Sequence, residues 1–185
     1  MPGAGGSQPA DSGTSEALHL EVAHFSPRMA LRSLVVGDEA ELRRIHSTPE
    51  VVLWWDPPAE GFPWSDEPES TRLTIEIDNA VAGLIQFSEE LTAKYRHATI
   101  DLFLDPALRD RGIGTAAVER LVRYLIEERG HHRITIDPGT ENLAAIRCYE
   151  KVGFKAVGVM RRYERPAGSE VWRDGLLMEL LAGEQ

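Results

Sequence analysis

The stretch 102-LFLDPALRDRGIGTAAVERL-121 decides the fold, because it joins an apolar strand to an amphipathic helix through a loop with two arginines and two glycines. The helix is expected to begin at Gly112, with Ile113, Ala117 and Leu121 on one face. A helix start exposes amide hydrogens and partial positive charge, which favour phosphate. Glycine lets backbone approach such a ligand without an intervening Cβ.

Several phosphate-binding patterns compete for this loop. A Walker loop is excluded because no lysine follows either glycine. The letters from Gly112 to Ala117 fit the dinucleotide pattern G-x-G-x-x-A, and Asp137 ends a later strand about 25 residues on. That pattern requires its glycines directly after a strand, whereas the six residues 107–112 follow Pro106. A plain helix cap with its arginines in solvent is the alternative without a ligand.

Outward from this stretch, strand and helix patterns alternate along most of the chain. Strands are expected at 18–25, 30–36, 72–78, 80–88, 97–106, 133–137, 154–160 and 170–180, and helices at 39–47, 112–129 and 141–152. Asp38 is a candidate cap for the first helix, and Asp78-Asn79 predicts a hairpin turn. Early hairpins followed by later crossovers predict an α/β (α+β) fold, with a single mixed, mostly antiparallel sheet flanked by helices.

Composition restricts the class of protein. The 185 residues carry a formal net charge of −10, which argues against a nucleic-acid partner. No apolar run is long enough to cross a membrane, and no secretory signal is recognisable, so we expect a cytoplasmic chain. We expect a disordered tail over 1–16, an added N-terminal strand within 17–28, one domain over 29–185, and a monomer or homodimer.

Two motifs together resemble those of a known superfamily. The pattern R-x-x-G-x-G/A, filled by Arg109, Gly112 and Gly114, resembles the pyrophosphate-binding signature of the GNAT acyl-CoA N-acetyltransferases. The segment 141–154 resembles their second signature, with matching positions Asn142, Tyr149, Gly153 and Phe154. The resemblance implies a GNAT-like acyl-CoA N-acyltransferase fold that uses acetyl-CoA as co-substrate and no metal.

The same resemblance assigns the coenzyme-binding residues. They are Leu104, Arg109, Asp110, Arg111, Gly112, Ile113, Gly114, Thr115, Asn142 and Tyr149. The amide of Leu104 would polarise the thioester carbonyl, and Asn142 would bind the pantetheine arm or order the loop. Tyr149 would protonate the departing thiolate, since a phenol and a thiol have similar reference pKa values. The alternative for Tyr149 is that it only packs on the apolar side of its helix.

Within the superfamily, 137–154 and 50-EVVLWWDPP-58 look most like the aminoglycoside 6'-N-acetyltransferases. This resemblance implies direct transfer, in a ternary complex, to a primary amine of a cationic small molecule. One departure is the short segment 88-SEELTAKYRHA-98, where those relatives often carry a long acidic and aromatic loop; Glu89 and Glu90 would partly substitute. The departure favours a different amine, such as a polyamine, a peptide N-terminus or a siderophore lysine, and a dinucleotide-binding module is the alternative without catalysis.

The remaining acceptor-binding candidates are Asp101, Asp137, Trp54 and Trp55. Alternation places Asp101 among apolar strand neighbours, where a carboxylate needs compensation by a substrate ammonium or by an arginine such as Arg96. Asp101 is therefore the candidate base or ammonium-binding group. Asp137 either helps to hold the acceptor or is a turn residue before proline. The two tryptophans either stack on a sugar ring or belong to the core.

Other chemistry-bearing residues are given structural roles. Cys148, the single cysteine, has no patterned histidine partner, so we interpret it as a small buried residue. His131 and His132 follow Gly130 at a helix end, where a histidine interacts favourably with the helix dipole. No metal-ligand pattern stands out.

Overall fold

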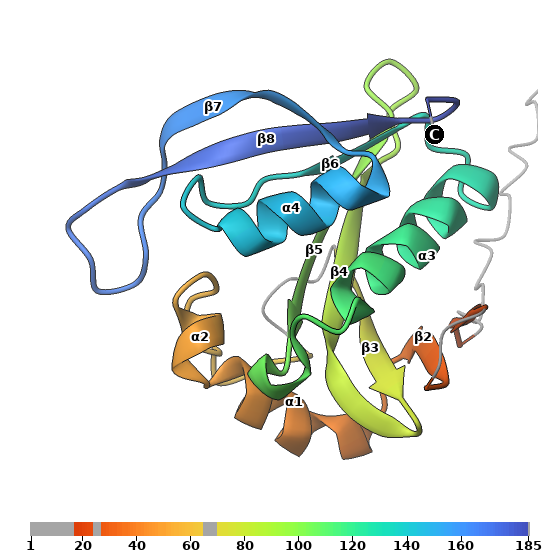
Figure 1. The fold of residues 1–185 in the computed structure, drawn as a ribbon, viewed down its shortest axis with the longest axis vertical. Helices are drawn as coiled ribbons and strands as arrows, with labels where there is room; N and C mark the ends of the chain where they lie inside the picture. The colour runs from red at the N-terminus through yellow and green to blue at the C-terminus, as the bar shows by residue number, and fades with distance from the viewer. Residues whose placement is uncertain (1–16, 24–26, 65–69, 185) are drawn as a thin grey trace, which may run out of the picture.

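The computed structural model describes residues 17–23, 27–64 and 70–184. They form one sheet with strand order β1-β2-β3-β4-β5-β6-β8-β7 (Figure 1). The strands are β1 His19–Val22, β2 Met29–Ser33, β3 Thr71–Ile77, β4 Ala80–Glu90, β5 His97–Leu104, β6 Arg133–Ile136, β7 Lys155–Glu164 and β8 Arg173–Leu181. Neighbours are antiparallel except β5 and β6, which are parallel, so the expected mixed, mostly antiparallel sheet is confirmed.

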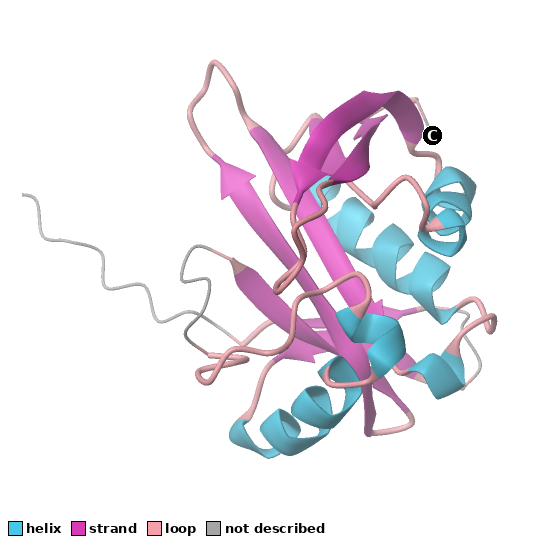
Figure 2. Ribbon diagram, turned by 90° about the vertical axis from the view of Figure 1, so that its left-hand side faces the viewer, coloured by secondary structure: helices cyan, strands magenta, loops and turns pink. Residues whose placement is uncertain are grey.

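Helices cover both faces of this sheet (Figure 2). α3 (Ile113–Glu127) and α4 (Leu143–Val152) share a core with the face that carries Ile85 and Ile100. α1 (Glu39–His46) and α2 (Pro49–Val52) pack on the opposite face around Leu84 and Phe103. Two short 3-10 turns, η1 (Val36–Asp38) and η2 (Pro106–Leu108), precede α1 and α3. In the described part of the chain, no helix is both long and apolar enough to cross a membrane.

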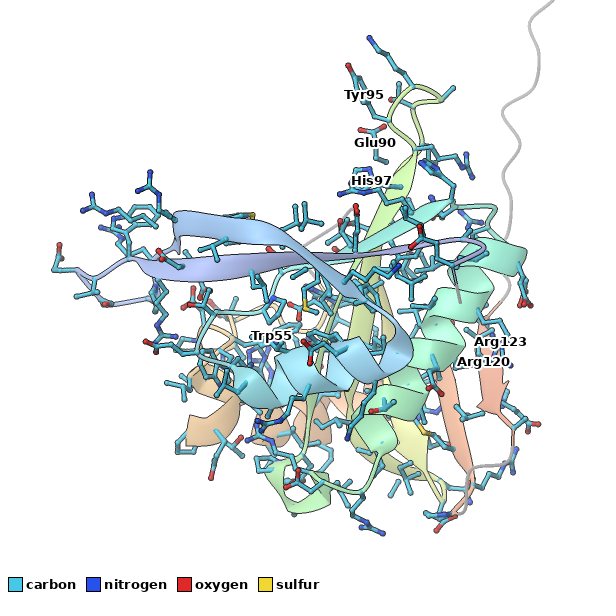
Figure 3. The ribbon with its side chains drawn as sticks, turned by 45° about the horizontal axis from the view of Figure 1, so that its top comes forward. Trp55, Glu90, Tyr95, His97, Arg120 and Arg123 are labelled. Atoms are coloured by element: carbon cyan, nitrogen blue, oxygen red, sulfur yellow. The ribbon has the colours of Figure 1, made fainter. Side chains whose placement is uncertain are left out.

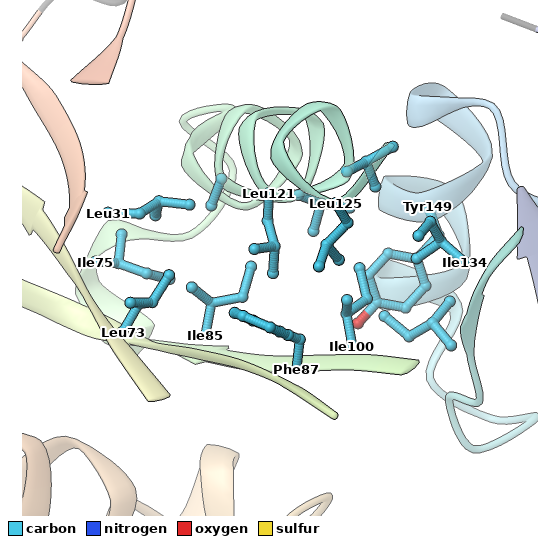
Figure 4. Packing of buried hydrophobic residues seen from close by; sticks show 14 of the residues in the cluster. Leu31, Leu73, Ile75, Ile85, Phe87, Ile100, Leu121, Leu125, Ile134 and Tyr149 are labelled. Carbon is cyan, nitrogen blue, oxygen red and sulfur yellow. The ribbon is translucent and has the colours of Figure 1, made fainter. Parts of the chain in front are cut away.

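The larger core lies between α3 and the centre of the sheet (Figure 4). Leu121 and Leu125 of α3 are fully buried against Ile85, Phe87 and Ile100, as the four-residue spacing of the helix predicts. Tyr149 of α4 joins the same cluster beside Ile134 (Figure 4). This packing fixes α3 and α4 relative to β5 and β6, between which the site described below opens.

The pairing of β5 with β6 is short. Its registered pairs are Ala98 with Ile134 and Thr99 with Thr135, whereas β5 continues to Leu104. The hydroxyls of Thr99 and Thr135 lie 2.9 Å apart at this last pair. Beyond it the two strands diverge, so that β6 and β8 run across the direction of β3 to β5 (Figure 1). The other edge of β5 stays paired with β4 down to Leu104.

Several elements differ from those expected from the sequence. The hairpin turn is correct, with Asp78 and Asn79 at φ 48° and 66°, but α2 was not predicted and β7 extends to Glu164. Asp38 is the N-cap residue of α1, as expected, but its carboxylate makes no hydrogen bond to that helix and accepts instead from Arg32, Thr74 and the Val35 amide. The tail expected over 1–16 and Phe25, the last residue of the first expected strand, lie outside the described residues.

Candidate active site

A cavity of about 1220 Å³ opens where β5 and β6 diverge. One part is lined by the start of α3 and by α4, and the other by α2, the residues that follow it, Asp137 and the end of β7. Seven carboxylate side chains and four lysine or arginine side chains line it. Three of the basic ones, Arg109, Arg147 and Lys151, belong to the α3 and α4 side. We call the α3 and α4 side the basic end, because it holds three of the four basic side chains, beside Asp110 and Glu141. We call the side with Asp56, Asp101, Asp137 and Glu164 the acidic end.

The start of α3 owes its shape to its two glycines. Gly112 is the N-cap at φ 77°, a conformation that glycine adopts without strain, and an added Cβ there would meet no atom within 4 Å. At Gly114, a Cβ would lie 3.3 Å from Leu104 Cδ1 and 3.5 Å from Cys148 Sγ. Gly112 thus turns the chain into the helix, and Gly114 lets α3 pack closely on β5 and α4. The first-turn amides have no acceptor within the helix and lie at the basic end of the cavity.

All but one of the candidate coenzyme-binding residues line the cavity. Leu104, Arg109, Asp110, Gly112, Ile113, Gly114, Thr115, Asn142 and Tyr149 all line the cavity, whereas Arg111 is not among its lining residues. Arg109 donates to the carbonyl of Glu50 at 3.2 Å, which joins the loop to α2. Asn142 is the N-cap of α4, and its Oδ1 accepts from the amide of Ala145 at 3.2 Å. Of its two expected roles, the structure shows the ordering of the helix start.

The free edge of β5 presents backbone amides toward the cavity. Asp105 N donates to Ala82 O on the β4 side at 2.8 Å. Because amides alternate in direction along a strand, those of Leu104 and Leu102 point to the opposite, divergent edge. The amide of Leu102 donates to Oδ1 of Asp101 at 2.8 Å, which fixes that carboxylate at the cavity edge. The amide of Leu104 is in the position expected for a donor to a thioester carbonyl.

Asp101 lies on the β5 face that carries Phe103, half-buried and opposite Gln86 of β4. Arg96, the arginine considered as its partner, donates to the carbonyl of Arg129 at 2.7 Å. Asp101 and Tyr149 come from different faces of the sheet, yet both line the cavity. The divergence of β5 and β6 brings them together.

Tyr149 is 5% exposed and belongs to the core, so its packing role and its place in the cavity coexist. Its pKa is raised well above the ordinary value, chiefly by burial and further by the neighbouring acidic groups of Asp101, Cys148 and Asp137. A phenol with a raised pKa keeps its proton at neutral pH, as a proton donor must.

The acidic end gathers Asp56, Asp137, Tyr163 and Glu164 around Asp101. The pKa of Tyr163 is raised to about 12, first by its interaction with Asp137 and then by burial. Burial raises the pKa of Glu164; Asp56 and Asp137 add to the rise, and Arg173 opposes it. Carboxylates placed together in this way favour a cationic ligand.

The two tryptophans form one wall of this end. Trp55 lies at right angles to the rings of Phe103 and His46, at centroid distances of 5.0 and 5.6 Å, and is labelled in Figure 3. Trp54 packs on Gly139, where an added Cβ would lie 3.0 Å from its ring, with the Arg173 guanidinium 5.6 Å from its centroid. Both line the cavity while they pack. Packing within the fold is therefore observed for both, and stacking on a sugar ring stays a prediction.

Comparison with known proteins identifies the family of this fold. Residues 32–154 match the model of the acetyltransferase (GNAT) family. The chain belongs to that family. This GNAT protein is 32% identical over 104 residues to the probable N-acetyltransferase YjcK of Bacillus subtilis, which covers 56% of each chain. It is 42% identical over 57 residues to a kanamycin resistance protein of Rhizobium radiobacter, which covers 31% of this chain and 53% of that one. The chain spans about half the length of these curated relatives.

Several solved structures share the fold of this chain. Mycobacterium smegmatis RimJ, in complex with CoA-disulfide, has a TM-score of 0.73 and 23% identity over 91% of this chain and 88% of that one. Vibrio cholerae spermidine N-acetyltransferase, in complex with CoA and spermine, has a TM-score of 0.70 and 21% sequence identity. The aminoglycoside acetyltransferase AAC(6')-Ib, in complex with coenzyme A and kanamycin, has a TM-score of 0.69 and 23% sequence identity. Each of the latter two covers 83% of this chain and 95% of its own.

Two residues expected at the acceptor site of this GNAT protein lie elsewhere. Glu89 accepts from Arg129 at 2.8 Å and His131 at 2.6 Å, and these bonds outweigh burial and lower its pKa. Glu90 accepts from the amide of Thr92 at 2.7 Å, on the hairpin that projects from the sheet (Figure 3). Neither lines the cavity. The eleven-residue β4 carries them past it, so we withdraw them as acceptor-binding candidates.

Sequence reasoning also missed residues of this GNAT site. Arg147 and Lys151 lie four positions apart on α4, a spacing that places both on one helix face and that was visible in the sequence. Tyr163 and Glu164 had no comparable signal. Cys148 lies half-buried with Sγ 3.4 Å from Thr115 Oγ1, and burial raises its pKa, which agrees with a packing role. His131 is buried, and its side chain pairs with Glu89. This pair gives the histidine a structural role.

Proposed function

We propose that the chain is an acetyl-CoA-dependent N-acetyltransferase that acetylates a primary amine of a cationic small molecule, the 6'-amine of an aminoglycoside being the leading class. The observation that carries the proposal is the single cavity that contains both the basic start of α3 and the carboxylates near Tyr149. The basic end suits the phosphates of a coenzyme, and the acidic end suits an ammonium group. Relatives named for kanamycin resistance and for N-acetylation support the same chemistry.

At the basic end, the coenzyme would be held by the residues that meet there. The first-turn amides of α3 would receive its diphosphate, with Arg109, Arg147 and Lys151 adding charge. The space beside Gly112, which no side chain fills, fits this use. Acetyl-CoA supplies an acetyl group on a thioester sulfur. The amide of Leu104 would donate to the carbonyl oxygen, which becomes negative during transfer.

At the acidic end, the acceptor nitrogen must lose a proton before it attacks. Asp101 would take this proton, either directly or through water, and Asp137 would help to hold the acceptor. A carbon–nitrogen bond then forms as the carbon–sulfur bond breaks. Tyr149 would give its proton to the departing sulfur, so the products are an N-acetylated amine and free thiol. Transfer within one ternary complex requires no acetylated residue of the protein, and Cys148, protonated and packed, offers no thiolate for one.

The decisive assay measures free thiol released from acetyl-CoA in the presence of a panel of amines. Kanamycin and tobramycin are expected to give the highest kcat/KM, and spermidine and a peptide with a free N-terminus test the alternative acceptors. Thiol release with none of these amines would contradict the proposal. Thermal-shift measurements with acetyl-CoA, NAD and NADP complement the assay, because a larger shift with NAD would favour the dinucleotide-binding alternative.

A polyamine is the second candidate acceptor, and one observation favours it. The β4–β5 connection is short, and Glu89 and Glu90 are engaged away from the cavity, so this connection supplies no carboxylate to the acceptor. A linear polyamine needs fewer contacts than an aminoglycoside built of three rings. A higher kcat/KM for spermidine than for kanamycin would establish this alternative.

A further inference from the structure

Three polar side chains form a row across the central strands, on the face that carries Phe103. Arg72 of β3 is registered opposite Gln86 of β4, and Gln86 is registered opposite Asp101 of β5. Side chains directly opposite each other on antiparallel strands project from the same face of the sheet and reach one another. All three line the cavity. We propose that Gln86 determines acceptor specificity, because its NH2 group donates to an oxygen atom of the acceptor beside the amine that Asp101 receives.

The orientation of the Gln86 amide is set by Arg72. Nε of Arg72 donates to Oε1 of Gln86 at 3.0 Å. A guanidinium has no acceptor atom, so the oxygen of the amide, and not its nitrogen, must face it. Arg72 is itself held, since Nη1 donates to the carbonyl of Pro63 at 2.6 Å and the guanidinium lies 5.6 Å from the centroid of the Phe62 ring. The NH2 group of Gln86 therefore lies on the side of the amide that faces away from Arg72.

This NH2 group is available as a donor. Gln86 is half-buried within the eleven-residue strand β4, and among the described residues its side chain hydrogen-bonds to Arg72 alone. A half-buried donor that stays unpaired costs free energy, which a ligand with an acceptor atom recovers. The wall of the cavity thus presents a hydrogen-bond donor next to the carboxylate of Asp101.

A donor beside a carboxylate selects a particular kind of amine. Asp101 would receive the ammonium, whereas the NH2 hydrogens of Gln86 repel a cation and pair with a hydroxyl, ether or carbonyl oxygen. Because opposite side chains start about 5 Å apart at their Cβ atoms, an oxygen separated from the nitrogen by two carbons fits both groups. The 6'-amine of an aminoglycoside and a peptide N-terminus each have such an oxygen, and a polyamine has none. The inference rests on the proposed function and narrows its acceptor class.

Two diamines that differ in one atom test the proposal. In 2,2'-oxybis(ethylamine) an oxygen stands two carbons from each nitrogen, and 1,5-diaminopentane has a methylene in its place. Gln86→Glu keeps an acceptor for Arg72 but replaces the NH2 group by an oxygen. The ratio of kcat/KM for the oxygen-bearing diamine to that for 1,5-diaminopentane, measured by thiol release from acetyl-CoA, should fall about tenfold from its value in the unmodified chain.

The change in this ratio isolates the hydrogen bond. The charge added by Gln86→Glu acts on both dications alike, and the different basicity of the two diamines is the same for every chain compared. Gln86→Met removes the donor without adding charge and should lower the ratio by a similar factor. Glu90→Gln is the matched control, because it makes the reverse exchange on the same strand outside the cavity, and it should leave the ratio within about twofold.

The outcomes separate this inference from the proposed function. If both Gln86 variants keep the ratio of the unmodified chain within about twofold, Gln86 makes no such bond, and the inference falls while the proposed function stands. Absence of thiol release by the unmodified chain with every amine, kanamycin and spermidine included, would instead remove the proposed function, and this inference with it.

Discussion

Asp38, between η1 and α1, can be compared with Asp101 and Asp137 in the cavity, because all three are carboxylates held within the packed structure. Asp38 is 3% exposed and accepts from both guanidinium nitrogens of Arg32 at 2.7 and 2.8 Å, from the Val35 amide at 3.0 Å and from the Thr74 hydroxyl at 2.7 Å. Its own chain thus compensates its charge from several directions.

The cavity carboxylates have a different environment. They line a space in which acidic side chains outnumber basic ones. Burial raises the pKa of Tyr149 and of Glu164, and the charge of Asp137 adds to both rises. A carboxylate compensated by its own fold contributes to stability, whereas carboxylates placed together beside an open space favour a cation from outside. The same residue type therefore serves the fold in one region and ligand binding in the other.

The largest effect is expected from Asp38→Asn. The substitution leaves the Arg32 guanidinium, whose side chain is 18% exposed, with Glu76 as its remaining carboxylate, at a cost of about 4 kcal/mol in the free energy of unfolding. Thermal denaturation should show Tm lower by about 10 °C, with kcat of the folded protein unchanged.

Asp78→Asn is the matched control for that change, because Asp78 lies exposed in the hairpin turn, where asparagine tolerates positive φ. Its unfolding free energy should change by less than about 0.5 kcal/mol. Equal losses of unfolding free energy for Asp38→Asn and Asp78→Asn would contradict the structural role of Asp38.

Tyr149→Phe tests whether the Tyr149 hydroxyl donates the proton to the departing thiolate. Loss of the proton donor should lower kcat about 300-fold, within the range for general acid catalysis, with little change in the Kd for acetyl-CoA. Single-turnover kinetics and calorimetric titration measure the two quantities. An unchanged kcat would remove Tyr149 as the acid.

Asp101→Asn is the functional counterpart of Asp38→Asn. It should lower kcat/KM for the acceptor about 100-fold, leave acetyl-CoA binding intact and leave Tm within a few degrees of its starting value. Steady-state kinetics with each substrate varied, together with thermal denaturation, gives all three quantities. A large loss of acetyl-CoA affinity would instead show that Asp101, like Asp38, supports the structure and does not act on the acceptor.

The smallest expected effect is a change in Tm that depends on pH, and it compares the buried Asp38 with Glu164 in the cavity. The folded pKa of Asp38 is lowered, because Arg32, Val35 and Thr74 together outweigh burial, so its stabilisation is present above its unfolded pKa and is lost as pH falls through the folded value. The folded pKa of Glu164 is raised by burial, so this group costs stability above its folded pKa. Glu164→Gln should raise Tm by on the order of 1 °C at pH 7 and by nothing at pH 4. A gain that persists at pH 4 would contradict this origin.

Much of the fold could be predicted from the sequence because its signals are local. The four-residue spacing in α3, the Asp78-Asn79 turn and Gly153, which ends α4 at φ 110°, each depend on neighbouring residues. Asp38 was placed correctly before α1, but its carboxylate is used by Arg32 on β2 and Thr74 on β3. That use depends on strand pairing, which local patterns do not contain.

The candidate site divides in the same way. The coenzyme-binding candidates of both motifs line the cavity apart from Arg111, because each motif is continuous along the chain; Gly153 and Phe154, the last matching positions of the second motif, do not line it. Glu89 was misplaced because its partners Arg129 and His131 lie 40 and 42 residues away. Tyr163 could not be found because it lies beyond the strand expected over 154–160, where the register of β7 with β8 shifts between Met160 and Glu164.

The early end of the β5–β6 ladder has a consequence for the exchange of backbone hydrogens with solvent. Thr99 marks the last pair, so the amides of Leu102 and Leu104 face water-accessible space although they sit in the middle of an eight-stranded sheet. Leu102 is shielded by the Asp101 carboxylate, and Leu104 has no corresponding bond among those recorded for the described residues. In a deuterium-exchange experiment on the unliganded chain, the Leu104 amide should therefore exchange far faster than its neighbours Phe103 and Asp105, and a bound thioester should slow it selectively.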